Sequence, residues 1–304
     1  MTLNTKDFRH LEIRSLVIQA IRDFFTGNLY LEVETPIVCP CVIPESQIDP
    51  VTSEGWYLQA SPELCMKRLL SKGFTKIFQI CKCFRKNERG LHHLSELTLL
   101  EWYTKNDTYL DLMNQCQGLI KFIAARLNLD NQIKYQDKII NLNQAWQKLT
   151  VQQAFDLYAD RSLNDALSEG SFDEIISFQI EPHLGNTNPC FLYNYPASLA
   201  SLAKLLPDDP EYAQRFEFYM AGIELANGFT ELTDPVEQKS RFEIENKIRR
   251  SQKKTVSSLP EKFLTDLEKM PNAAGIALGI DRLAMIFCNA PSIDGVVAFT
   301  PENL

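Results

Sequence analysis

Apolar residues recur at helical spacing in three segments of the chain. Between residues 7 and 26 they return every three or four positions, and Gly27 follows as a natural stop, so we expect a helix there. The same spacing predicts a helix over 62–72, with Pro62 in its first turn, and another over 107–127. These helices would supply apolar faces to a core.

Alternating or continuous apolar runs predict strands between these helices. The runs FQICKCF (78–84) and ELTLLEWY (96–103) have the length of strands, and an antiparallel pairing would leave a long charged loop over 86–95. Long loops between firm strands often carry function. The segment YLEVETPIV (30–38) also resembles a strand, at an edge or with a bulge, because Pro36 cannot donate to a ladder.

The second half of the chain predicts a hairpin, a charged helix and a final strand and helix. Ala221-Gly222 is expected to turn residues 216–235 into a hairpin, and the glycines of 275–287 begin a short strand that runs into a helix. The charged segment 236–254 is interpreted as a solvated amphipathic helix rather than a binding arm.

Composition narrows the class of protein. With 304 residues, no repeats and no linker-like shift in composition, we expect a single domain over residues 1–304. The apolar share of 45% and charged share of 23% are ordinary for a soluble globular protein, and the net charge of -8 disfavours a large nucleic-acid footprint. No apolar stretch reaches the length of a membrane span, and the eight scattered cysteines form no CxxC pair. We therefore expect a cytoplasmic protein with free thiols and no membrane contact.

The loop between the two predicted strands concentrates charge. Arg85 follows the first strand, and His93 lies across the loop. A guanidinium offers a planar fork of donors that matches phosphate oxygens, so these residues are suited to hold a polyphosphate. A surface hairpin with solvated charges explains the same residues equally well.

Three carboxylates recur every seven residues in the predicted hairpin: Glu217, Glu224 and Glu231. The turn can bring the first two to one face, where carboxylates among apolar neighbours need a cation such as Mg²⁺ or a substrate ammonium. A hairpin with its acids on the solvent side is the alternative, and the apolar flanks favour the site.

The final strand and helix offer a third candidate. Gly275 and Gly279 would let a ligand approach the backbone, and Arg282 adds a fixed cation in the first helical turn. Ordinary packing also explains a lone G-x-x-x-G strand.

Together these segments resemble the catalytic core of class II aminoacyl-tRNA synthetases, most closely its lysine branch. YLEVETPIV resembles motif 1, FR…HHLSELTLLEWY resembles motif 2, GIALGIDR resembles motif 3, and IELANGFTEL is close to the lysine-branch signature. The resemblance implies an α+β fold with a mainly antiparallel sheet flanked by helices, and a homodimer formed through motif 1. It also implies Mg²⁺-assisted activation of a lysine-like amino acid by ATP, giving an aminoacyl-adenylate.

The resemblance starts almost at Met1, which leaves no room for the N-terminal domain with which lysyl-tRNA synthetases read the anticodon. We therefore expect no anticodon recognition. This shorter form is similar to the elongation factor P–(R)-β-lysine ligases, as are YLQASPELCMKRLL and FLYNYPASLASLAK. It implies transfer of activated (R)-β-lysine, or lysine, to a lysine of elongation factor P. Ala277 stands where the synthetases have glycine, and its methyl group would reshape the floor of the amino-acid pocket.

The resemblance also implies roles for individual residues. Arg85 and Arg282 are expected to be catalytic, because fixed cations stabilise the charge that develops on the attacked phosphate. The ATP site would consist of Arg85, Lys86, Asn87, His93, Leu94, Leu97, Glu224, Leu225, Gly279 and Arg282, with Mg²⁺ held by Glu217 and Glu224. The amino-acid site would consist of Ser61, Pro62, Glu63, Glu101, Tyr103, Asn227, Glu231 and Ala277.

Two departures from the family pattern leave alternatives open. Residues 84–87 read FRKN where the pattern is F-R-N-E, and Leu97 replaces a phenylalanine that stacks on adenine, at an expected cost of about 1 kcal/mol. One alternative is an enzyme that passes a lysyl-adenylate to another acceptor. The other is a catalytically inactive paralogue that binds lysine-like amino acids or regulates a partner. The five charged residues expected in the site favour an enzyme: Arg85, Glu217, Glu224, Glu231 and Arg282.

Overall fold

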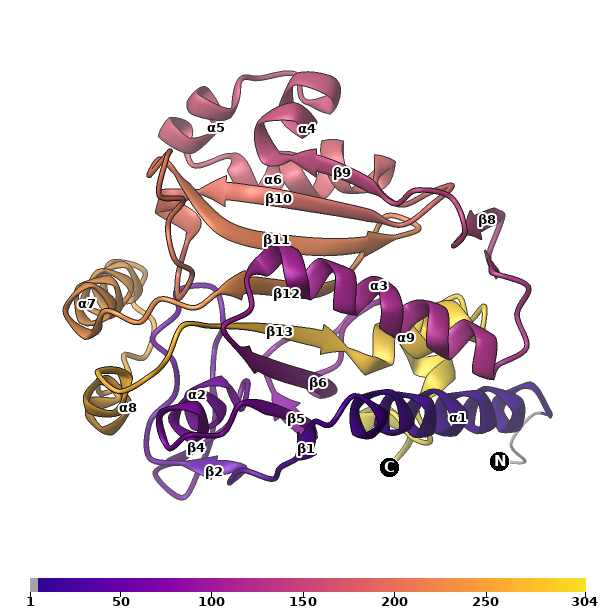
Figure 1. The fold of residues 1–304 in the computed structure, drawn as a ribbon, viewed down its shortest axis with the longest axis horizontal. Helices are drawn as coiled ribbons and strands as arrows, with labels where there is room; N and C mark the ends of the chain where they lie inside the picture. The colour runs from indigo at the N-terminus through magenta and orange to yellow at the C-terminus, as the bar shows by residue number, and fades with distance from the viewer. Residues whose placement is uncertain (1–4) are drawn as a thin grey trace.

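An eight-stranded sheet forms the centre of the computed structural model, which describes residues 5–304 (Figure 1). The strands lie in the order β1-β5-β6-β13-β12-β11-β10-β9, and only the two outermost pairs, β1–β5 and β10–β9, are parallel. Their bounds are β1 (Leu31–Glu32), β5 (Lys76–Phe84), β6 (Glu96–Lys105), β9 (Gln147–Thr150), β10 (Cys190–Pro196), β11 (Tyr212–Met220), β12 (Ile223–Thr230) and β13 (Ala273–Gly279). The expectation of a mainly antiparallel sheet flanked by helices is confirmed.

Two small sheets and a set of helices complete the fold. The small sheets are made by β2 (Val38–Cys39), β4 (Trp56–Leu58) and β3 (Val51–Ser53), and by β7 (Gln132–Tyr135) and β8 (Lys138–Asn141). The helices are α1 (Thr5–Gly27), α2 (Glu63–Ser71), α3 (Tyr109–Arg126), α4 (Val151–Tyr158), α5 (Leu163–Glu169), α6 (Phe172–Ile175), α7 (Pro235–Ser251), α8 (Glu261–Leu267) and α9 (Ile280–Phe287). In the described part of the chain, no helix combines the length and the apolar character needed to cross a membrane.

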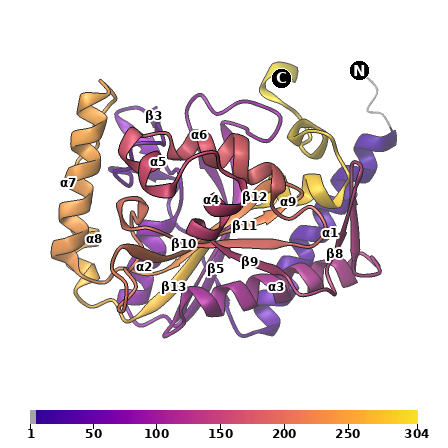
Figure 2. The ribbon, with the colours of Figure 1, turned by 90° about the horizontal axis from the view of Figure 1, so that it is seen from above.

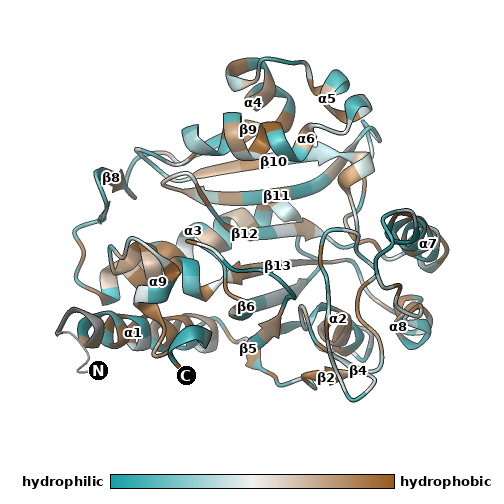
Figure 3. Ribbon diagram, turned by 180° about the vertical axis from the view of Figure 1, so that it is seen from behind, coloured by the Kyte–Doolittle hydropathy of each residue, from teal (hydrophilic) through white to brown (hydrophobic). Residues whose placement is uncertain are grey.

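The helices cover the two faces of the sheet differently. Seen from above, α3 lies on one side of the sheet, and α6 and β3 lie on the other, while α7 stands across one end (Figure 2). The helices α1, α3 and α9 bury apolar residues against the sheet in the largest core cluster, and α9 is mostly brown in the hydropathy view (Figure 3). Every residue of α9 is buried except Arg282. Arg282 is therefore the residue of α9 that remains accessible for contacts outside the core.

The predicted strand over residues 30–38 is only partly correct. Leu31–Glu32 pairs in parallel with β5 at the edge of the main sheet, and Val38–Cys39 pairs with β4 in a small sheet. The residues between them are irregular. Pro36 lies in this gap, where its missing N–H interrupts a ladder.

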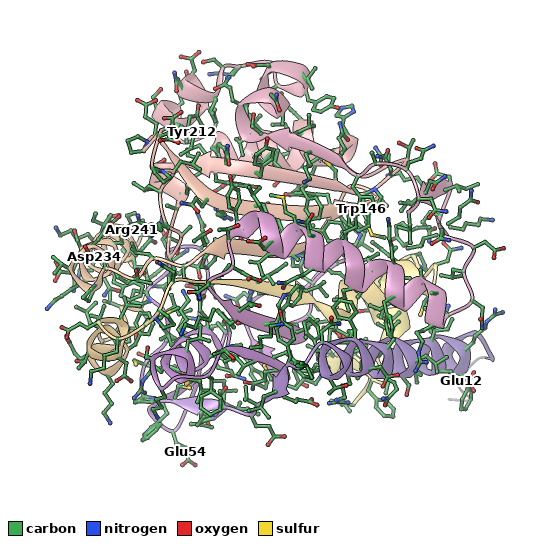
Figure 4. The ribbon with its side chains drawn as sticks, viewed as in Figure 1. Glu12, Glu54, Trp146, Tyr212, Asp234 and Arg241 are labelled. Atoms are coloured by element: carbon green, nitrogen blue, oxygen red, sulfur yellow. The ribbon has the colours of Figure 1, made fainter. Side chains whose placement is uncertain are left out.

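The prediction of a solvated amphipathic helix over residues 236–254 is confirmed. The segment is helical as α7, and Asp234 caps its N-terminus by accepting from the backbone N–H groups of Val236 and Glu237. Asp234 and Arg241 mark this helix at one end of the molecule in Figure 4, and Arg241 donates to backbone carbonyls of the neighbouring segment. One face of α7 is buried through Gln238, Phe242, Asn246 and Arg249.

An ion pair joins α1 to α9 beneath the sheet. Arg14 Nη2 lies 2.6 Å from Asp281 Oδ1, and the Asp281 side chain is 4% exposed. Asp281 Oδ2 also accepts from the backbone N–H of Thr98 over 2.6 Å, which ties β6 to the same carboxylate. Asp281, which precedes the motif 3 arginine, thus has a structural role.

The Arg14→Met variant is expected to lower the free energy of unfolding by about 3 kcal/mol, because it leaves the Asp281 carboxylate buried without its cation. The matched variant Arg22→Met, on the same helix, removes an exposed pair with Glu32 and should cost less than about 1 kcal/mol. Urea denaturation at one protein concentration measures both values. Equal losses for the two variants would contradict this account of the pair.

Candidate active site

A cavity of about 910 Å³ lies over the face of the sheet that α3 leaves uncovered. Side chains alternate across a strand, so residues two apart share a face. The floor is formed in this way by Leu97, Leu99, Glu101 and Tyr103 of β6, Gly275, Ala277 and Gly279 of β13, and Asn227 and Phe229 of β12. The predicted antiparallel pairing of the strands around residues 78–84 and 96–103 is confirmed, with Phe84 opposite Glu96.

A β-bulge at Leu225 brings two carboxylates to the same face. Ala221 and Gly222 form the predicted turn with φ values of 57° and 80°. Glu217 pairs with Asn227, and Tyr219 pairs with Glu224, so Leu225 is an extra residue in β12. Without it, the alternation of side chains would point Glu224 away from Glu217. Both carboxylates line the cavity.

Arg282 connects three segments that are distant in the sequence. Its Nη1 donates to the Glu224 carbonyl over 2.7 Å and lies 3.2 Å from Glu224 Oε2. Its Nε donates to the carbonyl of His92, and its Nη2 lies 2.6 Å from His93 Nε2. Burial, then the charges of Arg282 and Arg85, lower the pKa of His93 to about 4, so the ring is neutral and accepts from the guanidinium. The motif 2 loop, β12 and α9 thus meet at one guanidinium.

Arg85 has a donor that remains free for a ligand. It follows β5 directly and lines the cavity, where its Nη1 is 3.9 Å from Glu88 Oε1. Within residues 5–304, its buried Nε has no hydrogen-bond partner. A buried donor without a partner is costly, so an anion in the cavity would satisfy it. The arginine therefore fits a phosphate oxygen of ATP.

A group of three acids lies beside the two arginines. Glu217 accepts from Arg215 Nη2 and from the Tyr219 hydroxyl, each over 2.6 Å. Burial and then the charge of Glu224 raise the pKa of Glu217. Burial, then the charges of Glu224 and Glu217, raise the pKa of Glu181 to about 7. Arg85, Arg215 and Arg282 line this end of the cavity together with the three carboxylates.

This group fits Mg²⁺ only in company with a substrate. In the described chain, no set of three or more His, Cys, Asp and Glu side chains is arranged to hold a metal ion. Mg²⁺ is usually held by one or two carboxylates together with water and substrate phosphates. Glu217 and Glu224 line the cavity beside Arg282, so they fit that pattern.

A second group of acids surrounds a buried lysine at the other end of the cavity. Lys67 Nζ is 2.5 Å from Glu63 Oε1, and it also pairs with Glu231 Oε2. The side chains of Lys67 and Glu231 are 1% and 0% exposed. Glu101 accepts from the hydroxyl groups of Ser61 over 2.6 Å and of Tyr103 over 2.8 Å. Three carboxylates thus face one ammonium.

This imbalance raises the pKa values of two of the acids. Burial first, and then the charge of Glu63, raise the pKa of Glu101 to about 7. Burial raises the pKa of Glu231 to about 8, although Lys67 opposes the shift. Neither oxygen of Glu231 has a partner with hydrogen-bond geometry within residues 5–304. The pocket is therefore suited to a ligand with ammonium groups.

Glycine at position 275 leaves room for this pocket. A Cβ there would lie 2.2 Å from a ring carbon of Tyr103 and 2.4 Å from Glu231 Oε1. Ala277, two residues along the same face, pairs with Glu101 on one side and Asn227 on the other. Its methyl group therefore lies on the floor between the two groups of acids.

The structure brings most of the expected site residues to one cavity. Those that line it are Ser61, Glu63, Arg85, His93, Leu94, Leu97, Glu101, Tyr103, Glu217, Glu224, Leu225, Asn227, Ala277, Gly279 and Arg282. Pro62, Lys86, Asn87 and Glu231 are not among the lining residues. Pro62 precedes α2, the backbone N–H of Lys86 donates to Asp49, and Asn87 has a φ of 65° in the loop. Glu231 lies beneath the floor, beside Gly275.

Sequence reasoning did not identify several charged residues of the site. Lys67 lies four residues after Glu63 on a predicted helix, and Arg215 lies two residues before Glu217 on a strand. Both spacings place charges on one face and would have indicated the pairs. Glu181 and Glu45 lie in segments without a recognisable motif, so only the folded chain reveals that they line the cavity.

Comparison with known proteins agrees with this arrangement of motifs. A family described as tRNA synthetases class II (D, K and N) matches residues 1–303. The chain belongs to this family. The segments that resemble its three motifs are residues 30–38, which include β1, then β5 and β6 with their loop, and β13 with α9.

Three relatives of the chain carry the same name. The chain is 38% identical, over 95% of its length and 94% of the relative's, to a protein named elongation factor P--(R)-beta-lysine ligase from Pectobacterium carotovorum subsp. carotovorum (strain PC1). A protein of the same name from Klebsiella pneumoniae (strain 342) is 37% identical over 95% of the chain and 94% of the relative. Another protein of this name, from Haemophilus influenzae (strain PittGG), is 36% identical over 98% of the chain and 96% of the relative.

Proposed function

We propose that this protein is an ATP-dependent ligase that activates (R)-β-lysine, or lysine, and transfers it to a lysine of elongation factor P. The observation that carries the proposal is the shared cavity, which has three arginines and three acids at one end and an acid-rich amine pocket at the other. The names of the relatives support this acceptor. We propose ATP and Mg²⁺ as cofactors.

Activation requires the carboxylate of the amino acid to attack the α-phosphate of ATP. We assign Arg85 to that phosphate and Arg282 to the outer phosphates, where fixed guanidinium groups stabilise charge that grows in the transition state. Mg²⁺, when bound at Glu217 and Glu224, supplies further positive charge to the phosphates. His93, Leu94, Leu97, Leu225 and Gly279 line the cavity, and we assign them to the nucleotide. Direct ATP contacts by Lys86 and Asn87 stay a prediction.

The amino acid is proposed to lie with its side-chain ammonium at Glu231 and Tyr103 and its other amino group at Glu63 and Ser61. Glu101 orients both hydroxyl groups, because it accepts from Ser61 and Tyr103. Three carboxylates and Lys67 have a formal charge of -2, which two substrate ammonium groups balance. A pocket of this charge selects a diamine over an amino acid with one amino group.

The Michaelis constant for the amino acid is expected to fall about tenfold or more between about pH 6 and about pH 8. The pKa values of Glu101 and Glu231 are about 7 and about 8, so both acids gain charge as pH rises through this window. Charged carboxylates bind the substrate ammonium groups, whereas protonated ones do not. Steady-state exchange kinetics across this pH range measure the effect. A Michaelis constant that does not change with pH would contradict the assignment of these acids to the substrate amines.

The proposed function is tested with ATP, labelled (R)-β-lysine, elongation factor P and tRNA in one reaction. We expect β-lysine-dependent ATP–pyrophosphate exchange and label on the translation factor. Label on tRNA alone would instead make the chain a synthetase for a different acceptor. Absence of exchange with either isomer of lysine would favour the inactive paralogue that the altered motif 2 loop suggested.

We further propose that the chain acts in the cytoplasm as a homodimer, built from a single domain over residues 1–304 and without anticodon recognition. Exposed apolar residues occur along α1, on the motif 1 segment that follows it and on the small sheet of β2, β4 and β3, which suits a buried interface. They are Phe8, Leu16, Leu29, Leu31, Val38 and Trp56. Edge strand β1 leaves one side of the main sheet unpaired.

The variants Leu16→Glu and Leu31→Glu are each expected to raise the dimer dissociation constant at least tenfold, because the new carboxylate would be buried in the interface. The control Leu157→Glu changes a leucine of similar exposure on α4, outside motif 1. Sedimentation velocity measures all three variants. Dissociation constants that do not differ from the wild type would place any dimer contact elsewhere.

A further inference from the structure

The carboxylate of Glu45 lines the cavity and has no role in the sites described above. Across residues 5–304, the one hydrogen bond that involves Glu45 is at its backbone, where Arg249 Nη1 donates to the carbonyl oxygen over 2.8 Å. Its side chain lies on the loop between β2 and β3, facing the sheet from the other side of the cavity. A partly buried carboxylate without a cationic partner is suited to bind one.

The backbone around Glu45 is firmly held. Arg249 is 3% exposed, and it also donates to the carbonyl of Ile48 over 2.8 Å and to Asp49 Oδ1 over 2.9 Å. The backbone N–H of Ser46 donates to Glu245 Oε2 over 2.7 Å. Two residues of α7 therefore fix the loop at Glu45 and at the residues that follow it. The loop is a built part of the cavity wall.

The loop that carries Glu45 reaches Arg85. Pro50 forms an isolated antiparallel bridge with Arg85, and the backbone N–H of Lys86 donates to the Asp49 carbonyl over 2.8 Å. Glu45 lines the cavity together with Arg85 and Glu63. Arg85 is assigned to the α-phosphate and Glu63 to an amino group of the substrate. In the aminoacyl-adenylate, the reactive carbonyl carbon is bonded between those two parts. Glu45 lines the same cavity, so its carboxylate is available to an amine that approaches this carbon.

We propose that Glu45 is the catalytic residue that receives the acceptor lysine and removes a proton from its ammonium group. This inference rests on the proposed function. An N–H bond of the ammonium breaks and its proton passes to a carboxylate oxygen of Glu45. The free amine then attacks the carbonyl carbon, a C–N bond forms, and the C–O bond to the α-phosphate breaks to release AMP. The second amine proton and the proton on Glu45 pass to water.

If Glu45 acts as the base, it is needed for transfer of the amino acid and not for its activation. Activation joins a carboxylate to a phosphate and moves no proton, so it needs no base. Transfer requires a neutral amine, and a lysine side chain is almost entirely protonated at neutral pH. Burial raises the pKa of Glu45, which strengthens it as a proton acceptor.

The test compares three reactions of Glu45→Gln. Exchange of pyrophosphate reports activation, and trapping of the adenylate by hydroxylamine, which is neutral at neutral pH, reports attack without a base. Transfer of labelled β-lysine to elongation factor P reports attack by a protein ammonium. We expect exchange and trapping within about twofold of wild type, and transfer slowed about 100-fold, the size of a general-base contribution. Glu45→Asp, which keeps a carboxylate, should recover part of the rate.

The matched control is Glu261→Gln, an exposed acid at the cavity rim on α8, which should transfer at the wild-type rate. Unchanged transfer by Glu45→Gln would overturn the inference, as would equal losses of exchange, trapping and transfer. A wild-type protein without exchange would instead refute the proposed function itself.

Discussion

Replacement of Arg85 by glutamine is expected to slow β-lysine-dependent ATP–pyrophosphate exchange about 1000-fold. As the carboxylate attacks, negative charge grows on the α-phosphate oxygens, and a fixed guanidinium donor there lowers the barrier. The buried Nε of Arg85 has no partner within residues 5–304, so it is free for that oxygen. The effect should fall on kcat more than on the Michaelis constant for ATP, because the interaction strengthens in the transition state.

A neighbouring cation provides the control for this variant. Lys82 lies on β5, three residues before Arg85, with a half-exposed side chain that pairs with Glu96. Lys82→Gln should exchange within about twofold of the wild type, and thermal melting should show that both variants are folded. If Arg85→Gln exchanged nearly as fast as Lys82→Gln, the assignment of Arg85 to the α-phosphate would be wrong.

The second large effect is expected for Glu231→Gln, which should lower kcat/KM for the amino acid about 300-fold. Glu231 is buried beside Tyr103 and Gly275, and loss of its charge leaves the substrate ammonium in a buried pocket without its partner. Removing one member of a buried charge pair costs about 2–5 kcal/mol, and about 3.4 kcal/mol corresponds to 300-fold. The Michaelis constant for ATP should change little, because the nucleotide lies at the other end of the cavity.

Glu243→Gln is the comparison variant, since it neutralises an exposed acid of α7. A simple loss of stability in Glu231→Gln would affect the ATP and amino-acid constants together and lower the melting temperature. A selective loss for the amino acid separates the two explanations. Equal kinetics of Glu231→Gln and Glu243→Gln would remove Glu231 from the amino-acid site.

The periodic parts of the chain were predictable because local patterns decide them. The helix over 7–26, the paired strands around the 86–95 loop and the turn at Ala221-Gly222 each follow from spacing, breakers and turn chemistry. The segment over 30–38 was not, because its apolar residues pair with two different sheets on either side of Pro36. The burial of α7 depends on the β2–β3 loop, which is far away in the sequence.

The candidate site divides in the same way. Its arginines and two of its acids lie in motifs that a sequence displays, whereas the bulge at Leu225 that unites Glu217 with Glu224 is a property of strand register. Lys67 and Arg215 could have been predicted, because Lys67 lies four residues after Glu63 on a helix and Arg215 lies two residues before Glu217 on a strand. Glu45 and Glu181 enter the cavity from irregular segments, so no periodic pattern marks them.

A crystal structure with Mg²⁺, (R)-β-lysine and a non-hydrolysable ATP analogue tests the central claim most directly. That claim places a triphosphate and a diamine in one cavity, with the α-phosphate at Arg85 and the carboxylate of the diamine between Arg85 and Glu63. We expect an α-phosphate oxygen within hydrogen-bond distance of Arg85 Nε, the outer phosphates against Arg282, and the side-chain ammonium against Glu231. A nucleotide bound outside this cavity, or an amino acid bound away from Glu231, would contradict the account.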